Sequence, residues 1–145
     1  MASYLGTQVL GGVKPFEKRR FIVVTDRYLV VARMPRVPNV YLYALLGGIQ
    51  RILRPGEIRY GPEDMAKTME ALDKHKVHAI PLEQIRMIDI VKGKRGLLRA
   101  RKGSFTIWLA DGRQIELVGE YDLPYDEAAE LFSQLFPGRV RVFTQ

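Results

Sequence analysis

Cysteine is absent from the sequence, and this absence excludes disulfide bonds, thiolate nucleophiles and cysteine-based metal sites. Histidine is scarce as well. The chain has two, His75 and His78, and no His-Glu pattern of a zinc site surrounds them. No G-x-S-x-G, G-x-x-x-x-G-K or G-x-G-x-x-G phrase occurs. The sequence therefore predicts a protein that is not an enzyme and that uses no metal or other cofactor.

Long apolar segments are also missing. The longest run, from Val40 to Ile49, has ten residues, whereas about twenty are needed to cross a bilayer as a helix. In the N-terminal segment the positive charges follow the apolar residues instead of preceding them, which is not the order of a signal peptide. We therefore expect a cytoplasmic protein, with a membrane as a peripheral partner only.

The residues that are present suit one ordinary globular domain with a basic surface. Of the 145 residues, 47% are hydrophobic, which is enough for one continuous core, and we expect a single domain over residues 1–145. Lysine and arginine number 23 against 16 acidic residues, and the net charge is +7. Such a protein is attracted over a distance to phosphate groups and to anionic membranes.

The first half of the chain predicts one hairpin followed by helices. Residues 21–35 (FIVVTDRYLVVARMP) form two runs of β-branched and aromatic residues that reverse at a Thr-Asp-Arg triplet. Because nearly every residue of the two runs is apolar, we expect strands buried on both faces. The strand pattern stops over about residues 36–76. We expect a helix there from Val40 to about Leu53, capped by Asn39, and a second helix that begins near Pro62.

The second half returns to strands and ends in a helix. Pro81 separates a short strand from a longer one near residues 85–91, and another short strand is expected over residues 97–101. A further hairpin is expected around Asp111-Gly112, a pairing that tight turns prefer. The tail over residues 139–143 is either an edge strand or loose. The last helix carries a wide apolar stripe that must lie against a sheet: Ala128, Leu131, Phe132, Leu135 and Phe136.

The expected elements amount to about seven short strands and one C-terminal amphipathic helix, an α+β arrangement that is mainly β. Five segments resemble pleckstrin-homology-like (PH-like) domains, in particular uncharacterised archaeal and bacterial members: FIVVTDRYLVVARMP, YALLGGIQ, GPEDMAKTMEALDKHK, AIPLEQIRMIDI and FTIWLADGRQIEL. The resemblance implies a bent antiparallel sheet or partly open barrel, capped by the C-terminal helix. It also implies a helical insertion between strands 2 and 3, at about residues 36–76.

The resemblance implies an interaction domain without naming its ligand. Phosphoinositide-binding members of the fold often hold the lipid headgroup with Lys and Arg on a long first hairpin loop. This sequence departs from that pattern, because its first turn is short and contains Asp26. The candidate sites therefore come from the residues themselves.

A cluster of six cations within eleven residues is the first candidate site: Lys92, Lys94, Arg95, Arg99, Arg101 and Lys102. Several cations, together with backbone N–H groups at glycines, can converge on one anion, so this segment predicts binding of phosphate or of an anionic lipid surface. Nucleic acid is the alternative partner, although the aromatic side chains that stack on bases are absent from the segment. The same cations would also serve simply to guard an exposed edge strand.

The second candidate surface lies in the insertion, over residues 40–54. Its apolar residues cover more than one helical face, which predicts contact with a protein partner, a second copy of the chain or a bilayer interface: Tyr41, Leu42, Leu45, Leu46 and Ile49. The alternative is that this segment packs back on its own sheet. Trp108 is likewise either a ring for stacking a ligand or a cover for the sheet. The function that we expect is that of a non-catalytic interaction module that binds a protein partner or a second copy of itself through the insertion, with peripheral contact to an anionic membrane as an extension and nucleic-acid binding through residues 92–102 as the alternative.

Overall fold

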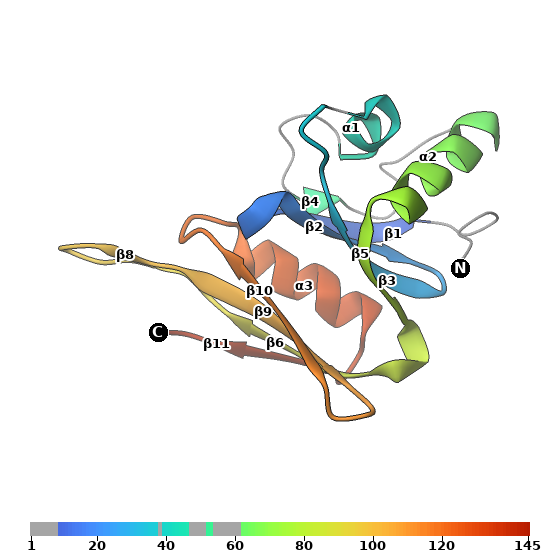
Figure 1. Cartoon of the computed structure of the whole chain (residues 1–145). Coiled ribbons are helices and arrows are strands. Elements are labelled where there is room, and N and C mark those ends of the chain that lie inside the picture. Colours follow the sequence, from blue (N-terminus) through green and yellow to red (C-terminus); the bar gives the residue numbers. More distant parts are fainter. Residues whose placement is uncertain (1–8, 38, 47–51, 54–61) are drawn as a thin grey trace. The chain divides into compact units, whose positions relative to one another are not determined.

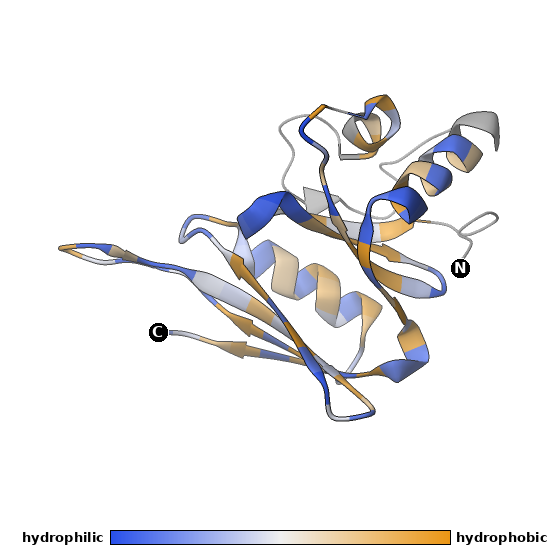
Figure 2. Cartoon of the chain, in the orientation of Figure 1, coloured by the Kyte–Doolittle hydropathy of each residue, from blue (hydrophilic) through white to orange (hydrophobic). Residues whose placement is uncertain are grey.

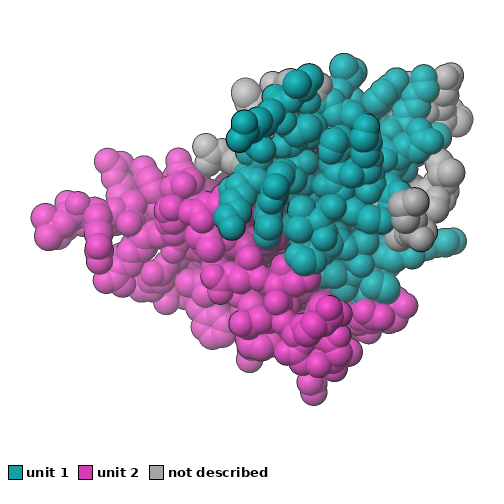
Figure 3. Space-filling view, in the orientation of Figure 1, with its two compact units in different colours: residues 1–14, 18–82 teal, residues 15–17, 83–145 magenta. Residues whose placement is uncertain are grey.

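The computed structural model describes residues 9–37, 39–46, 52–53 and 62–145 of the chain (Figure 1). The chain divides into two compact units, which Figure 3 shows in different colours. Unit 1 comprises residues 1–14 and 18–82, and unit 2 comprises residues 15–17 and 83–145. The single domain expected from the chain length stays a prediction.

Unit 1 is built on a five-stranded sheet in the order β4-β1-β2-β3-β5. Its strands are β1 (Val9–Phe16), most of which belongs to this unit, β2 (Arg20–Thr25), β3 (Tyr28–Arg33), β4 (Ile52–Leu53) and β5 (Lys76–Pro81). β2 and β3 form the predicted hairpin, with Ile22 opposite Val31. The hydroxyl oxygen of Thr25 accepts the N–H of Tyr28 at 2.9 Å and closes the turn. Both faces of the hairpin are buried, as its apolar sequence predicts.

The described residues of unit 1 include the helices α1 (Val40–Leu46) and α2 (Pro62–Lys74). α1 begins where the sequence predicts, because the side-chain oxygen of Asn39 accepts the N–H of Tyr41 at 3.0 Å and that of Leu42 at 3.2 Å. α2 also begins at its predicted proline. Both helix starts were therefore readable from local capping residues.

The predicted extension of the first helix to Leu53 is wrong. α1 ends at Leu46, and Ile52 and Leu53 form β4, which pairs antiparallel with Val13 and Gly12 of β1. A β-branched residue such as Ile52 suits a strand, and the pairing supplies hydrogen-bond partners to the edge of β1. The part of the predicted helix over residues 47–51 lies outside the described residues.

The sheet and the helices of unit 1 share a hydrophobic cluster. It draws buried side chains from β2, β3, α1 and α2: Phe21, Val23, Val30, Ala32, Leu42, Leu45, Met69, Ala71 and Leu72. Met65 packs against its edge. Met65, Met69 and Leu72 are the apolar stripe of α2, so this helix buries the face that helical spacing predicts.

Unit 2 contains a four-stranded sheet in the order β10-β9-β6-β11. Its strands are β6 (Ile85–Val91), β9 (Gly103–Leu109), β10 (Gln114–Gly119) and β11 (Val140–Phe143). β9 and β10 form the predicted hairpin around Asp111-Gly112, where the N–H of Gly112 donates to the carbonyl of Leu109 at 3.0 Å. The tail is the edge strand β11, which runs parallel to β6. Two short 3₁₀ helices, η1 (Glu17–Arg19) and η2 (Leu82–Gln84), precede β2 and β6 along the chain.

The C-terminal helix α3 (Tyr125–Leu135) packs on the sheet of unit 2, as predicted. Ala128, Leu131 and Phe132 are buried, and the ring of Phe132 meets that of Phe105 of β9 edge-on at 5.5 Å between centroids. Edge-to-face packing of this kind adds to the stabilisation from burial alone. The predicted apolar stripe is therefore the face that α3 buries.

The α+β class and the predominance of strands are confirmed. The described residues form eleven strands in three open sheets, and the bent sheet or partly open barrel of about seven strands stays a prediction. The third sheet is the two-stranded pair β7 (Lys94–Arg95) and β8 (Ala100–Arg101). No helix in the described ranges is long and apolar enough to cross a membrane.

Candidate functional site

The six predicted cations lie on a hairpin that extends from the ends of β6 and β9 and is seen at the left of Figure 1. We call residues 92–102 the basic hairpin. Lys94 pairs with Arg101 and Arg95 pairs with Ala100, and the N–H of Gly96 donates to the carbonyl of Arg99 at 3.2 Å. These bonds leave a two-residue turn at the tip.

The predicted strand over residues 97–101 is therefore wrong in its first part. Leu97 and Leu98 form the turn, and only Ala100–Arg101 is strand. Leucine pairs predict strand or helix far more often than a turn, because turns favour Gly, Pro, Asn, Asp and Ser. Gly96 accommodates the reversal at this point, because a β-carbon there would lie 2.4 Å from the carbonyl oxygen of Arg99.

The base of the basic hairpin is held by backbone and side-chain hydrogen bonds. The N–H of Lys92 donates to the carbonyl of Phe143 in β11 at 2.9 Å. The side-chain amide of Gln145 donates to the carbonyls of Lys92 and Lys102, at 2.9 and 2.8 Å. One amide thus bridges the two chain segments that lead into and out of the hairpin, so its base is fixed while residues 94–102 are exposed.

The two cations at the base already have acidic partners. Lys92 forms an ion pair with Asp126, and Lys102 forms one with Glu17 and a longer one with Glu120. The hydrogen bond to Glu17 raises the pKa of Lys102 above its ordinary value. These two lysines therefore serve the attachment of the hairpin to unit 2.

The four cations beyond the base, Lys94, Arg95, Arg99 and Arg101, are different. No carboxylate among the described residues lies within ion-pair distance of any of them. In the sequence, no acidic residue stands between Asp89 and Asp111. All four side chains are exposed to solvent.

The cross-strand register of the hairpin adds repulsion to this charge. Lys94 lies directly opposite Arg101, and like charges in this position destabilise a pair of strands. The repulsion falls when an anion lies between or beside the cations. The arrangement is therefore chemically suited to accept an anion.

The tip of the basic hairpin is apolar and fully exposed. Leu97 and Leu98 have relative exposures of 106% and 100%, the largest among the exposed hydrophobic residues of the described chain. Figure 2 shows the hydrophobic colour at the outer end of this hairpin. Sequence reasoning missed these two residues as part of a site. The observable sign was an apolar pair enclosed by Gly96 and Arg99 within a segment that lacks acidic residues.

Three of the five candidate residues of the insertion surface have described side chains, and two of these are buried within unit 1. Leu42 and Leu45 have relative exposures of 0% and 1% and belong to the hydrophobic cluster, whereas Tyr41 is partly buried at its edge. The side chain of Leu46 and the whole of Ile49 lie outside the described residues. The alternative interpretation, in which α1 packs back on its own sheet, accounts for Leu42 and Leu45.

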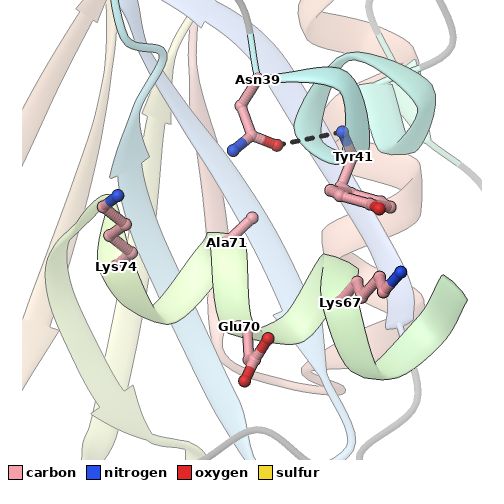
Figure 4. Close-up of a pocket in the computed structure, with 6 residues that line it drawn as sticks. All are labelled: Asn39, Tyr41, Lys67, Glu70, Ala71 and Lys74. Atoms are coloured by element: carbon pink, nitrogen blue, oxygen red, sulfur yellow. Dashed lines mark hydrogen bonds between the residues drawn. The ribbon is translucent and has the colours of Figure 1, made fainter. Parts of the chain in front are cut away.

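A cleft of about 540 Å³ lies between α1 and α2, and Figure 4 shows the residues that line it: Asn39, Tyr41, Lys67, Glu70, Ala71 and Lys74. The ammonium group of Lys67 is 5.8 Å from the centroid of the Tyr41 ring, a cation–π distance. The side-chain oxygen of Asn39 is used in capping α1. The cleft thus combines a helix cap, one acid and two lysines, without a convergent set of groups for one ligand.

Trp108 lies on the sheet face opposite to Phe105, Ile107 and Leu109, as its position in the strand predicts. It lines a groove of about 390 Å³ with Arg86, Met87, Leu109, Gly112 and Arg141. Its indole N–H donates to Asp89 at 2.9 Å. Its polar group is therefore engaged within unit 2, and a role in stacking a ligand stays a prediction.

Asp89 also accepts two hydrogen bonds from Arg141 of β11, at 2.6 and 2.8 Å. These bonds, with that of Trp108, hold the pKa of Asp89 below its ordinary value in spite of partial burial. The network ties the edge strand β11 to β6 and β9. Its groups satisfy one another, which indicates a structural role.

No group of three His, Asp or Glu side chains in the described part of the chain is placed to hold a metal ion. His75 directly follows α2, and its backbone N–H donates to the carbonyl of Ala71. In comparisons with known proteins, no family model, no curated protein and no solved structure matches the chain. The basic hairpin is therefore the candidate site with the most specific chemistry.

Proposed function

We propose that the protein is a non-catalytic interaction module that docks peripherally on an anionic membrane surface through the basic hairpin. The observation that carries this proposal is a set of four exposed cations that have no acidic partner among the described residues and that lie on a hairpin whose base is hydrogen-bonded. The proposal includes a cytoplasmic location, which the cysteine-free composition favours.

A PH-like fold is part of the proposal. It is supported by the order of elements along the chain: the hairpin β2–β3, the insertion with α1 and α2, later strands, and α3 packed on a sheet. Folds of this kind present loops at the ends of strands for binding, and the basic hairpin is such a loop. An experimental structure that shows one continuous bent sheet would support this assignment.

The strength expected from the four cations suits reversible attachment. Each Lys or Arg close to an anionic membrane contributes about 1 kcal/mol, so four contribute about 4 kcal/mol. That corresponds to an increase in binding of about a thousandfold. Because the contribution is electrostatic, it weakens as salt is added.

Two other partners remain as alternatives. Nucleic acid offers phosphates to the same cations, but residues 92–102 contain no aromatic side chain to stack on a base. A protein partner or second copy of the chain would contact the insertion. The exposed Val37 and Val40, at 83% and 75% relative exposure, favour that possibility, whereas Leu42 and Leu45 are buried and cannot contribute to such a contact.

The test is co-sedimentation with anionic and neutral vesicles over a range of salt concentrations, beside titrations with DNA and RNA. The variant R95E/R99E/R101E reverses three charges on the hairpin. R27E/R36E/R86E reverses three exposed charges elsewhere. Each substitution lowers the net charge by two, so both variants fall from +7 to about +1.

We expect the parent protein to bind anionic vesicles and not neutral ones, and to be released by salt. The hairpin variant should lose most of this binding, while the control variant should keep most of it. Equal losses in the two variants would contradict a localised site. Binding to nucleic acid but not to vesicles would assign the hairpin to the alternative partner, and a stable oligomer without either would favour the protein contact.

A further inference from the structure

The leucine pair at the tip of the basic hairpin is not explained by the fold of unit 2. Leu97 and Leu98 are fully exposed to solvent, so they bury no surface against the other described residues. A turn gains nothing from leucine, because leucine neither supplies a left-handed conformation nor bonds to its own backbone. In water, two adjacent exposed leucines add cost without a structural return.

The cations stand directly behind this apolar tip. Arg99 adjoins Leu98, and Arg95 is separated from Leu97 only by Gly96. Lys94 and Arg101 face each other one position further from the tip than Arg95 and Ala100. At about 3.3 Å per residue along a strand, the cations lie within roughly 10 Å of the tip.

That order of groups matches the depth profile of a membrane. A segment lying at the interface buries its apolar part about 5–10 Å into the boundary between headgroups and acyl chains. Cations at the corresponding distance behind it stand at the level of the headgroup phosphates. Lys and Arg side chains can also lay their apolar stems along the apolar layer while their charged ends reach the headgroup phosphates.

Resting on the function proposed above, we propose that Leu97 and Leu98 insert into the acyl-chain boundary of an anionic bilayer while Arg95, Arg99 and Arg101 contact its headgroup phosphates. The partner is then a lipid bilayer specifically. A soluble polyanion, including nucleic acid, offers phosphates but no apolar layer to receive the leucines. In this anchor the cations select anionic lipid headgroups, and the two leucines at the tip insert into the bilayer.

The depth to which the tip of the hairpin inserts into the bilayer is measured with a single fluorescent label. Because the sequence lacks cysteine, Leu98→Cys provides a unique thiol for an environment-sensitive fluorophore. Val37→Cys, at an exposed position on unit 1, provides the control label. The labelled proteins are mixed with anionic vesicles that carry nitroxide quenchers either on the headgroup or at a defined depth in the acyl chain.

We expect the emission of the label at position 98 to shift to shorter wavelength and to be quenched by acyl-chain nitroxides. The label at position 37 should show neither effect. If the label at position 98 stays accessible to an aqueous quencher while the protein is bound, the tip does not insert and the inference is overturned.

The contribution of the tip is measured with L97S/L98S, since serine is a favourable turn residue and the positions are exposed. V37S/V40S is the matched control, because it also removes two exposed apolar side chains. We expect L97S/L98S to partition about tenfold more weakly into anionic vesicles, in keeping with partial burial of two leucines, and the control to be unchanged. Circular dichroism verifies that both variants are folded.

The outcomes separate the two proposals. If L97S/L98S binds as the parent does while R95E/R99E/R101E does not bind, the inserted tip is refuted and docking by charge stands. If the parent binds no anionic vesicle at all, both fail. If the parent binds nucleic acid in preference to vesicles, the leucines have another role and the inference is also overturned.

Discussion

At the scale of single residues, Asp89 is the most connected acidic side chain in the described part of unit 2. Its carboxylate accepts bonds from both Arg141 and Trp108 and has 13% relative exposure. Arg141 and Trp108 come from β11 and β9, on either side of β6. Asp89 thus joins three neighbouring strands through one carboxylate.

This network predicts a stability that depends on pH in the acid range. The pKa of Asp89 is lowered from its ordinary 3.8, mainly by the hydrogen bonds from Arg141. The unfolded chain therefore binds the proton more readily, and the stabilisation is complete above pH 3.8 and is lost as pH falls through the lower folded-state pKa. We expect Asp89→Asn to lose about 1 kcal/mol at neutral pH and to flatten the acid limb of the unfolding free energy.

The measurement is urea unfolding from neutral to acid pH. Asp111→Asn is the control, because Asp111 pairs with Arg113 on an exposed turn, where an ion pair contributes little, and Asn-Gly keeps the turn chemistry. If Asp89→Asn and the parent show the same acid dependence, the network does not stabilise the folded state.

At the scale of elements, α1 depends on its cap. Seven residues are too few for a stable isolated helix, so capping and the burial of Leu42 and Leu45 must hold it. Asn39→Ala removes the acceptor for the N–H groups of Tyr41 and Leu42, and we expect a loss of about 1 kcal/mol in the free energy of unfolding. Chemical denaturation measures the loss, and hydrogen exchange locates it in α1.

Asn39→Ser is the rescue variant, since serine also caps helices. It should recover most of the stability that Asn39→Ala loses. A loss of equal size in both variants would show that Asn39 acts through something other than the cap.

The elements that the sequence predicted correctly carry strong local patterns. β2–β3 and β9–β10 combine strand-forming residues with turn residues, and α3 has a wide stripe at helical spacing. β1 was missed because Gly11, Gly12 and Pro15 argue against a strand. Its pairing explains Gly12: a β-carbon there would lie 2.3 Å from the carbonyl oxygen of Ile22 in β2. Only the neighbouring strand reveals this requirement.

The candidate site was predictable in part. The six cations were found from their density, but the division into two that have acidic partners and four that have none in the described part of the chain depends on acids that are distant in sequence, such as Glu17 and Asp126. The tip was misassigned because a leucine pair predicts regular structure by propensity. Exposure, which decides its role, is a tertiary property.

At the scale of the whole molecule, the net charge of +7 affects how fast the protein reaches an anionic surface. The charge acts over a distance wherever it lies, whereas contact depends on the hairpin. We expect both triple charge variants to associate with anionic vesicles more slowly than the parent and by similar factors. Only R95E/R99E/R101E should also dissociate faster.

Stopped-flow mixing with labelled vesicles at several salt concentrations separates the two rates. The association rate of the parent should fall steeply with salt, since the attraction is screened. Unchanged dissociation in the hairpin variant would place the lasting contact elsewhere on the molecule.

The fixed base and projecting end of the basic hairpin also determine where the chain is open to proteolysis. Trypsin cleaves after Lys and Arg, and it would find Lys94, Arg95, Arg99 and Arg101 together on exposed backbone. A nick there leaves both ends held by the amide of Gln145 and by the pairing of β6 with β9. The fragments would stay associated, so the cut protein would remain folded although its basic hairpin is no longer continuous. Protection of these sites from trypsin would indicate that the hairpin is docked.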